Sequence, residues 1–261
     1  MPGDDPQTLI VGEGAERRVI AYRATPCIAP DGTSLFWLSG FMSDMASTKA
    51  TAVSDWAAMH GLGATRFDYS GHGVSQGPFT EGTIGRWLEE ALAVFTRVTR
   101  GPQVIIGSSM GGHIALLLLR KLLQTEPAEA ARIKGLVLID PAWDMTEELM
   151  WKRFGEEARD AILNHGCYEQ PSAYGAPYPI TRRLIEDGRE NLLARVPFDP
   201  GRPIVILQGL QDPDVPAEHT RELTHFLTGG HVKLIEIPDG EHRLSRPQDL
   251  ALLFDAIGSL V

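Results

Sequence analysis

The chain has 261 residues, 43% of them hydrophobic and 22% charged, and a net charge of −10 at neutral pH. This composition is typical of a globular protein with one domain of the larger α/β kind, and the acidic charge argues against nucleic acid or anionic membranes as partners. The longest apolar run, Ile114 to Leu119, is too short to cross a bilayer, so stable membrane insertion is not expected.

The composition of the first residues and the two cysteines favour a cytoplasmic location. The first ten residues are acidic and lack the apolar stretch of a secretory signal or a transit peptide. Cys27 and Cys167 lie far apart and lack metal-ligand spacing, which predicts free thiols in a reducing compartment. A disulfide between these two residues is the alternative that the sequence leaves open.

Strands and helices alternate along most of the chain. Short β-rich runs separated by glycines predict an N-terminal hairpin, and apolar runs bounded by turn residues predict six more strands. The expected strands are Thr8 to Val11, Arg18 to Ala24, Ser34 to Leu38, Ala64 to Asp68, a run that begins at Val104, Leu136 to Ile139, Ile204 to Leu207 and Val232 to Ile237. The expected helices are Lys49 to His60, Thr83 to Val98, the run after Ser109, Ala217 to Leu227 and Pro247 to Leu260. We therefore expect an α/β fold with a mostly parallel eight-stranded sheet flanked by helices.

The segment 141–200 interrupts this alternation after the sixth strand. It contains no convincing strand, but helical patterns cover Thr146 to Phe154, Glu156 to Leu163 and Thr181 to Ala194. Ligands bind near the carboxyl ends of strands in open α/β sheets, so we expect 141–200 to form a small helical cap within one domain, 1–261. The residues expected to line a pocket beneath it are Trp143, Met145, Met150, Trp151, Phe154, Tyr168, Tyr174 and Tyr178. Packing of these side chains against the sheet is the alternative for each of them.

The stretch Val104 to Leu119, VIIGSSMGGHIALLLL, predicts a strand, a sharp turn and a helix around Ser109. A serine at the top of a strand takes a strained backbone conformation, and small residues two before and two after it let the strand and helix approach closely. Gly107 and Gly111 occupy those positions. We interpret Ser109 as a nucleophile; a glycine-rich turn with a serine helix cap is the alternative. A phosphate-binding loop is excluded because the Gly-Lys-Ser/Thr ending is missing.

A serine nucleophile needs a histidine base that is held by an acid. His242 follows the last predicted strand and so reaches the edge of the sheet that carries Ser109, whereas His113 lies on the helix after Ser109 and His72 between two glycines. Packing is the expected role of His113, and shaping a turn that of His72. Asp212 follows the preceding predicted strand and is the expected acid, with Asp214 and Asp140 as alternatives.

The sequence resembles the α/β-hydrolase family, and within it the ABHD10-like palmitoyl thioesterase branch. The matching stretches are Ser39-Gly40-Phe41, Thr48-Lys49-Ala50, Arg66 to Gly71, Gly107 to Gly112, Gly209 to Pro216 and His242-Arg243. This resemblance implies a triad of Ser109, Asp212 and His242, and an oxyanion hole formed by the backbone amides of Phe41 and Met110. It also implies the depalmitoylating or acyl-glucuronide esterase activity of the animal relatives.

The expected reaction is the transfer of an acyl group from an ester or thioester to water, with a small-molecule or acyl-carrying substrate. No ligand cluster in the sequence calls for a metal, and no cofactor is expected. A C–C bond hydrolase or a perhydrolase would use the same triad, and a noncatalytic small-molecule receptor on this scaffold is a less favoured alternative. The sequence does not predict the oligomeric state.

Overall fold

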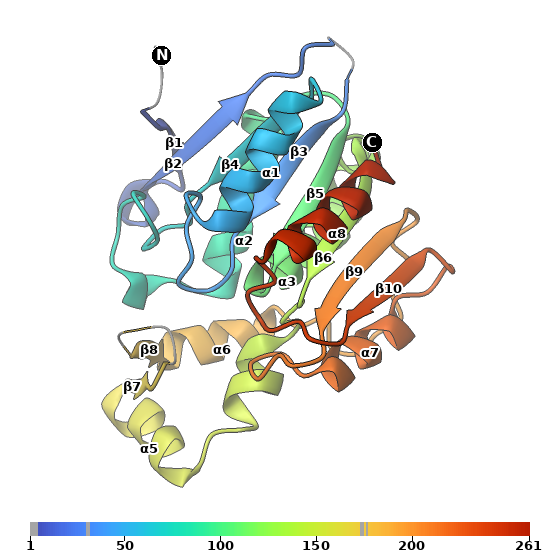
Figure 1. Ribbon diagram of the computed structural model, residues 1–261. Coiled ribbons are helices and arrows are strands. Elements are labelled where there is room, and N and C mark those ends of the chain that lie inside the picture. Colours follow the sequence, from blue (N-terminus) through green and yellow to red (C-terminus); the bar gives the residue numbers. More distant parts are fainter. Residues whose placement is uncertain (1–4, 30–31, 173–174, 176) are drawn as a thin grey trace.

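An eight-stranded sheet forms the centre of the computed structural model, which describes residues 5–29, 32–172, 175 and 177–261 (Figure 1). Its strands lie in the order β1-β2-β4-β3-β5-β6-β9-β10. The bounds are β1 (Gln7–Val11), β2 (Arg18–Thr25), β3 (Ser34–Leu38), β4 (Gly63–Phe67), β5 (Gln103–Ser108), β6 (Ile133–Ile139), β9 (Ile204–Gly209) and β10 (Val232–Ile237). Strands β1 and β2 pair antiparallel, β2 also pairs antiparallel with β4, and the remaining pairs are parallel. The predicted mostly parallel sheet is therefore confirmed.

Helices cover both faces of this sheet (Figure 1). Side chains of α1 (Thr48–Met59) and α8 (Pro247–Gly258) belong to one core cluster, and those of α2 (Ile84–Arg97), α3 (Met110–Thr125) and α7 (Ala217–Phe226) belong to the other. The short helices η1 (Gly14–Glu16), η2 (Phe79–Glu81) and α4 (Pro127–Ala131) complete the connections. None of the helices that the structure describes is long and apolar enough to span a membrane.

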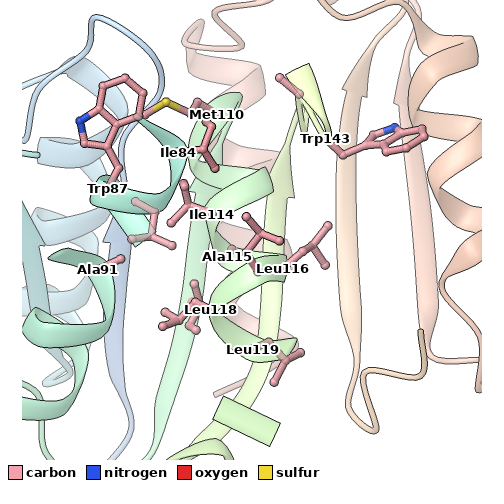
Figure 2. Close-up of a cluster of buried hydrophobic side chains, with 14 of the residues drawn as sticks. Ile84, Trp87, Ala91, Met110, Ile114, Ala115, Leu116, Leu118, Leu119 and Trp143 are labelled. Carbon is pink, nitrogen blue, oxygen red and sulfur yellow. The ribbon is translucent and has the colours of Figure 1, made fainter. Parts of the chain in front are cut away.

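Strand β5 and helix α3 lie at the centre of the core. Every residue of β5 is buried, and so is each residue of α3 from Met110 to Leu119. Figure 2 shows several of these α3 side chains packed among those of α2, including Trp87. Full burial of one such aliphatic side chain stabilises a fold by roughly 1.5–3 kcal/mol. The serine turn therefore lies between two fully buried segments of the core.

The segment 141–200 forms a cap at one end of the sheet (Figure 1). It contains η3 (Thr146–Trp151), α5 (Glu156–His165), β7 (Cys167–Gln170), β8 (Tyr178–Thr181) and α6 (Arg182–Glu190). The expectation of a cap without strands was wrong, because β7 and β8 form an antiparallel hairpin. Each strand has only four residues, and Pro179 stands inside β8, so neither shows the pattern of a strand in the sequence. Element η3 is a π-helix rather than a continuous α-helical stretch to Phe154.

Both cysteines are free, as the sequence predicts. The thiol of Cys27 donates to the carbonyl of Gly61 at 3.3 Å. Cys167 begins β7 inside the cap. Burial raises the pKa of the Cys167 thiol, and the neighbouring Glu169 carboxylate adds to that effect. A thiolate at this position is thus disfavoured.

Candidate active site

The turn at Ser109 is strained, and positions 107 and 111 on either side of it in the sequence have room only for glycine. Ser109 has φ 54° and ψ −117°, a conformation that non-glycine residues rarely adopt, and its N–H donates to the Ile139 carbonyl at 2.8 Å. A Cβ at Gly107 would lie 2.4 Å from the Gly111 carbonyl oxygen, and one at Gly111 would lie 2.1 Å from that of Leu38. The backbones of β3, β5 and α3 therefore meet without side chains between them, as the sequence predicts for a nucleophile elbow.

Asp212 and His242 form a tight pair at the same edge of the sheet. The loop after β9 carries Asp212 and the loop after β10 carries His242, and Asp212 Oδ2 lies 2.6 Å from His242 Nδ1. The other oxygen of Asp212 accepts the N–H groups of Asp214 and Val215 at 2.8 and 2.9 Å. These hydrogen bonds fix the carboxylate, which in turn fixes the orientation of the imidazole. Asp214 serves this turn through its backbone N–H.

Ser109 and His242 line one cavity of about 630 Å³. It lies beyond the carboxyl ends of β3 and β5, where the strand order changes direction, which is the position at which open α/β sheets bind ligands. Gly40 is close enough that a Cβ there would lie 3.3 Å from Ser109 Cβ. The structure thus brings together the predicted nucleophile and the predicted base at one cavity.

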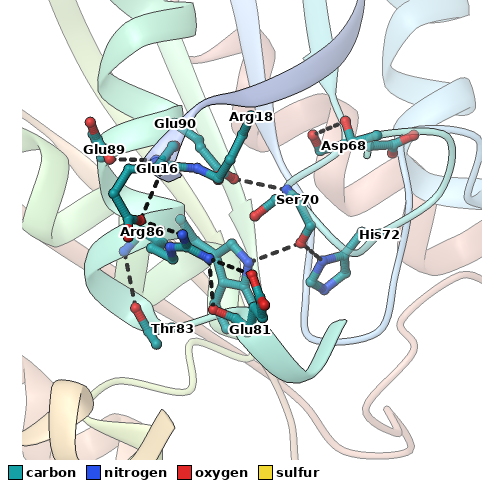
Figure 3. A network of polar contacts seen from close by, with 12 residues as sticks. Glu16, Arg18, Asp68, Ser70, His72, Glu81, Thr83, Arg86, Glu89 and Glu90 are labelled. Carbon is teal, nitrogen blue, oxygen red and sulfur yellow. Dashed lines mark hydrogen bonds and ion pairs between the residues drawn. The ribbon is translucent and has the colours of Figure 1, made fainter. Parts of the chain in front are cut away.

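The loop after β3 is held in place by two buried polar side chains from the turn after β4. Met42, with φ 57°, donates its N–H to His72 Nε2 at 3.2 Å, and Met45 donates its N–H to Asp68 Oδ1 at 2.7 Å. Burial lowers the pKa of His72 to about 4, so the ring is neutral and can accept this hydrogen bond. Figure 3 shows His72 beside Ser70, whose carbonyl lies 3.2 Å from His72 Nδ1.

Phe41 and Met110, the predicted oxyanion-hole residues, belong to two chain segments next to Ser109. Phe41 belongs to the loop just described and lines the cavity, and Met110 is the first residue of α3. The N–H groups of the first helical turn have no carbonyl partner within the helix, and the helix dipole makes that end electropositive. The backbone around Ser109 is therefore suited to stabilise negative charge on a carbonyl oxygen.

One wall of the cavity is apolar and comes largely from the cap. The side chains that form it are Phe41, Met145, Leu149, Met150, Phe154 and Tyr178. The Phe41 ring contacts the Tyr178 ring edge to face, with centroids 5.8 Å apart, so the loop after β3 and the cap hairpin meet at the cavity. Lys49, Arg153 and Arg243 lie along the more polar part.

The structure corrects part of the predicted pocket. Trp143 lies outside the cavity: its ring stacks on His219 at 4.5 Å, and its Nε1 donates to the His219 carbonyl at 2.7 Å. Tyr168 also lies outside, with its ring against Phe154. Trp151 is not among the lining residues either, and Tyr174 lies outside the described residues. Trp143 therefore packs the cap against α7, and Tyr168 packs within the cap, so packing, the alternative that the sequence left open, is the role of these two residues.

His113 has the packing role that the sequence predicts. It is 1% exposed, its Nδ1 accepts the N–H of Asp144 at 3.2 Å, and its Nε2 lies 3.2 Å from the Asn191 carbonyl. It therefore joins α3 to the cap and does not reach the cavity. His219, on α7, is also buried and packs against Trp143.

Two ionisable residues of the site, Lys49 and Asp140, lie outside the triad that the sequence predicts. Lys49, on α1, is half-buried and donates through Nζ to the Arg243 carbonyl, next to His242. Burial lowers the pKa of Lys49 to about 8. Asp140 had been considered only as an alternative to Asp212, but it lies beside it. The Thr48-Lys49-Ala50 stretch, which matches the ABHD10-like branch, was the sequence signal for Lys49. The position directly after a predicted strand was the signal for Asp140.

Asp140, Asp212 and His242 are the described residues that could offer three metal-ligating atoms at once, all within 4.8 Å of one another. However, His242 Nδ1 and Asp212 Oδ2 are engaged with each other at hydrogen-bond distance, and the cationic Lys49 interacts electrostatically with both carboxyl groups. This donor set fits a carboxyl–imidazole pair better than a cation site.

Comparison with known proteins agrees with this architecture. The Alpha/beta hydrolase family matches residues 32–252. The chain is 27% identical to human Palmitoyl-protein thioesterase ABHD10, mitochondrial, over 244 residues, which cover 93% of this chain and 76% of that protein. Mouse alpha/beta hydrolase domain-containing protein 10 superimposes with a TM-score of 0.82 at 26% identity, over 97% of this chain and 98% of that one.

A solved protein from Agrobacterium vitis S4 is more similar still, with a TM-score of 0.95 and 42% identity over 98% of each chain. Est1E from Butyrivibrio proteoclasticus, with ferulic acid bound, shares the fold with a TM-score of 0.70 at 19% identity, over 96% of this chain and 99% of that one. The family match covers most of the chain, including the serine turn and both loops that carry Asp212 and His242. The chain therefore belongs to the Alpha/beta hydrolase family.

Proposed function

We propose that the protein is a serine hydrolase that cleaves carboxylic esters or thioesters through an acyl-enzyme, with Ser109, His242 and Asp212 as its triad. The observation that carries this proposal is that Ser109, at φ 54°, lines the same cavity as His242, whose Nδ1 lies 2.6 Å from Asp212 Oδ2. A strained serine, a base beside it and an acid that orients the base are the parts required for nucleophilic acyl transfer.

In the first half-reaction, Ser109 Oγ attacks the carbonyl carbon while His242 Nε2 takes the hydroxyl proton. The backbone N–H groups of Phe41 and Met110 donate to the oxyanion of the tetrahedral intermediate. The intermediate collapses, the bond to the leaving alkoxide or thiolate breaks, and His242 protonates the leaving group. Asp212 stabilises the imidazolium that exists between these two proton transfers.

In the second half-reaction, His242 removes a proton from water, and the resulting oxygen nucleophile attacks the acyl carbon on Ser109. A second tetrahedral intermediate forms in the same oxyanion site, and its collapse breaks the ester bond to Ser109. His242 returns the proton to the serine oxygen. The products are a carboxylic acid and the free enzyme.

The apolar wall supports an acyl chain as the group bound next to Ser109. Phe41, Met145, Leu149, Met150 and Tyr178 offer hydrocarbon and aromatic surface there. Burial of each methylene of such a chain contributes about 0.8 kcal/mol. Relatives named palmitoyl-protein thioesterases support the thioester as one substrate class. Those relatives are named as mitochondrial, whereas a cytoplasmic location of this chain remains a prediction.

The test is hydrolysis of p-nitrophenyl esters of increasing acyl length and of a palmitoyl thioester. We expect turnover by the wild-type protein and a loss of about 10⁴-fold or more in kcat for Ser109→Ala. Ser54→Ala, on helix α1 and outside the cavity, is the matched control and should retain wild-type turnover. Wild-type protein that hydrolyses none of these substrates would contradict the proposal, and product analysis with C–C substrates and peracids would follow.

A further inference from the structure

A second carboxyl group lies behind the Asp212–His242 pair. Asp140 directly follows β6, is 0% exposed, and has φ 43°. A carboxyl oxygen of Asp140, one of Asp212 and a ring nitrogen of His242 all lie within 4.8 Å of one another. The loops after three neighbouring strands, β6, β9 and β10, therefore place two acids against one imidazole.

Among the residues that the structure describes, only one oxygen of Asp140 has a hydrogen-bond partner. Oδ1 accepts the N–H of Gly209 at 2.8 Å, whereas Oδ2 is buried and has no hydrogen-bond partner among the described residues. A buried carboxylate oxygen without a donor is costly, because desolvation penalises its charge. A buried carboxylic acid is less costly. The geometry thus favours a proton on Asp140 rather than a second negative charge.

Charges from every neighbouring element act on this carboxyl. Asp212 and Asp249 are acidic and Lys49 is cationic, the charge of Arg243 acts on Lys49, and Arg246 is paired with Asp249. Burial and the adjacent Asp212 charge raise the pKa of Asp140 to about 9, against the opposing effects of Gly209 N–H and Lys49. Two carboxyl groups this close hold one proton and one negative charge at neutral pH.

We propose that Asp140 is a positioning residue for the proposed hydrolase reaction: a reserve acid that stays protonated beside charged Asp212 and takes over the negative charge that faces His242 when Asp212 is lost. This inference rests on the proposed function. Asp140 does not line the cavity, so it acts through the imidazole and not on the substrate. Loss of the Asp212 charge removes the repulsion that adds to burial in keeping Asp140 protonated, and the released volume lets its carboxylate approach Nδ1.

The experiment compares Asp212→Ala, Asp140→Asn and the double variant by steady-state kinetics on the best ester. The loss of a triad acid lowers kcat about 10⁴-fold when nothing replaces it. We expect the double variant to show this full decrease in kcat. For Asp212→Ala we expect a decrease in kcat of only about 10²-fold, which is half of the full effect on a logarithmic scale. The effects should appear in kcat and not in KM. The kcat of Asp212→Ala should also rise with pH as Asp140 ionises, and the double variant should lack this limb.

The chain offers a matched control for buried acids. Asp144 follows Asp140 in the same loop, is 1% exposed and also has a positive φ, 49°, but its carboxylate binds the N–H groups of Leu193 and Ala194. Adding Asp144→Asn to Asp212→Ala should not remove the pH-dependent activity. Asparagine suits position 140 because it tolerates positive φ and keeps an oxygen for Gly209 N–H.

A measurement on the wild-type protein needs no variant to fold. The NMR signal of the His242 ring should show an inflection near pH 9, where Asp140 ionises beside it. Asp212→Ala that is as inactive as the double variant, together with a His242 signal without that inflection, would overturn the inference. Inactive wild-type protein would instead refute the proposed function, so the two failures are distinguishable.

Discussion

At the scale of single residues, the serine turn depends on two missing side chains. A Cβ at Gly111 would lie 2.1 Å from the backbone oxygen of Leu38, and that oxygen belongs to β3, which cannot move as a flexible side chain could. We predict that Gly111→Ala lowers the free energy of unfolding by about 1–3 kcal/mol, as overpacking of a core does. It should also lower kcat, because β3 leads directly into Phe41. Urea unfolding and ester hydrolysis measure the two effects.

Gly258→Ala is the control for this substitution. Gly258 ends helix α8, is exposed, and has no atom within 4 Å of the position of a Cβ. Alanine restricts the unfolded chain more than glycine does, and it fits the helical conformation of the folded protein. This variant should therefore be as stable as wild type or more stable by about 0.4–1 kcal/mol. Equal stability of Gly111→Ala and Gly258→Ala would show that the approach of β3 to α3 is not tight.

The positions of the predicted site residues show which parts of the site the sequence could predict. Ser109, Asp212 and His242 each follow a parallel strand, and the carboxyl ends of such strands share one edge, so chain order alone predicts that they meet. Trp143 follows a strand as well, but which way its ring turns depends on packing against His219, which is 76 residues away in sequence. Long-range packing of this kind leaves no local pattern.

At the scale of elements, the cap shapes the cavity through its π-helix. In η3 the N–H of Lys152 donates to the Glu147 carbonyl, five residues back, so the turn is wider than in an α-helix. Leu149 and Met150 of this turn line the cavity. The sequence shows only a helical pattern there, because one extra residue in a single turn hardly alters the apolar spacing. Elements of this kind are found only when the neighbouring structure is known.

This arrangement predicts that the cap selects the acyl length. Leu149→Trp puts a larger ring into the apolar wall and should lower kcat/KM for long-chain esters at least about 10-fold, the effect expected from a filled hydrophobic pocket. Hydrolysis of a short ester should change little. Leu163→Trp, on helix α5 and 47% exposed, changes the cap without touching the cavity and should keep the wild-type preference. A parallel loss for all chain lengths in Leu149→Trp would argue against an acyl site on this wall.

At the scale of the whole molecule, the cap and the sheet share one core. The same cluster of buried side chains contains Leu138 of β6, Leu118 of α3, and Ile162, Ile180 and Leu184 of the cap. The α/β architecture follows from local periodicity, since apolar strands alternate with amphipathic helices along the chain. The attachment of the cap does not follow from local periodicity, because the contacts of the cap with the rest of the core join residues far apart in sequence. His113 is such a contact, between α3 and Asn191.

His113 makes this attachment sensitive to acid. Burial lowers its pKa to about 3, below the ordinary value of 6.5 that applies to the unfolded chain. Between these two values the unfolded chain binds a proton that the folded protein does not, so stability is greatest above about pH 6.5 and falls as the pH decreases toward 3.

His113→Gln keeps a donor and an acceptor but does not ionise. We predict that wild type loses stability relative to this variant by about 1.4 kcal/mol per pH unit below 6.5. Urea unfolding of both proteins at pH 7, 6, 5 and 4 measures the difference, in which the other titrating groups cancel. A difference that stays constant with pH would mean that His113 can be protonated in the folded protein, and that the junction between cap and sheet opens to water.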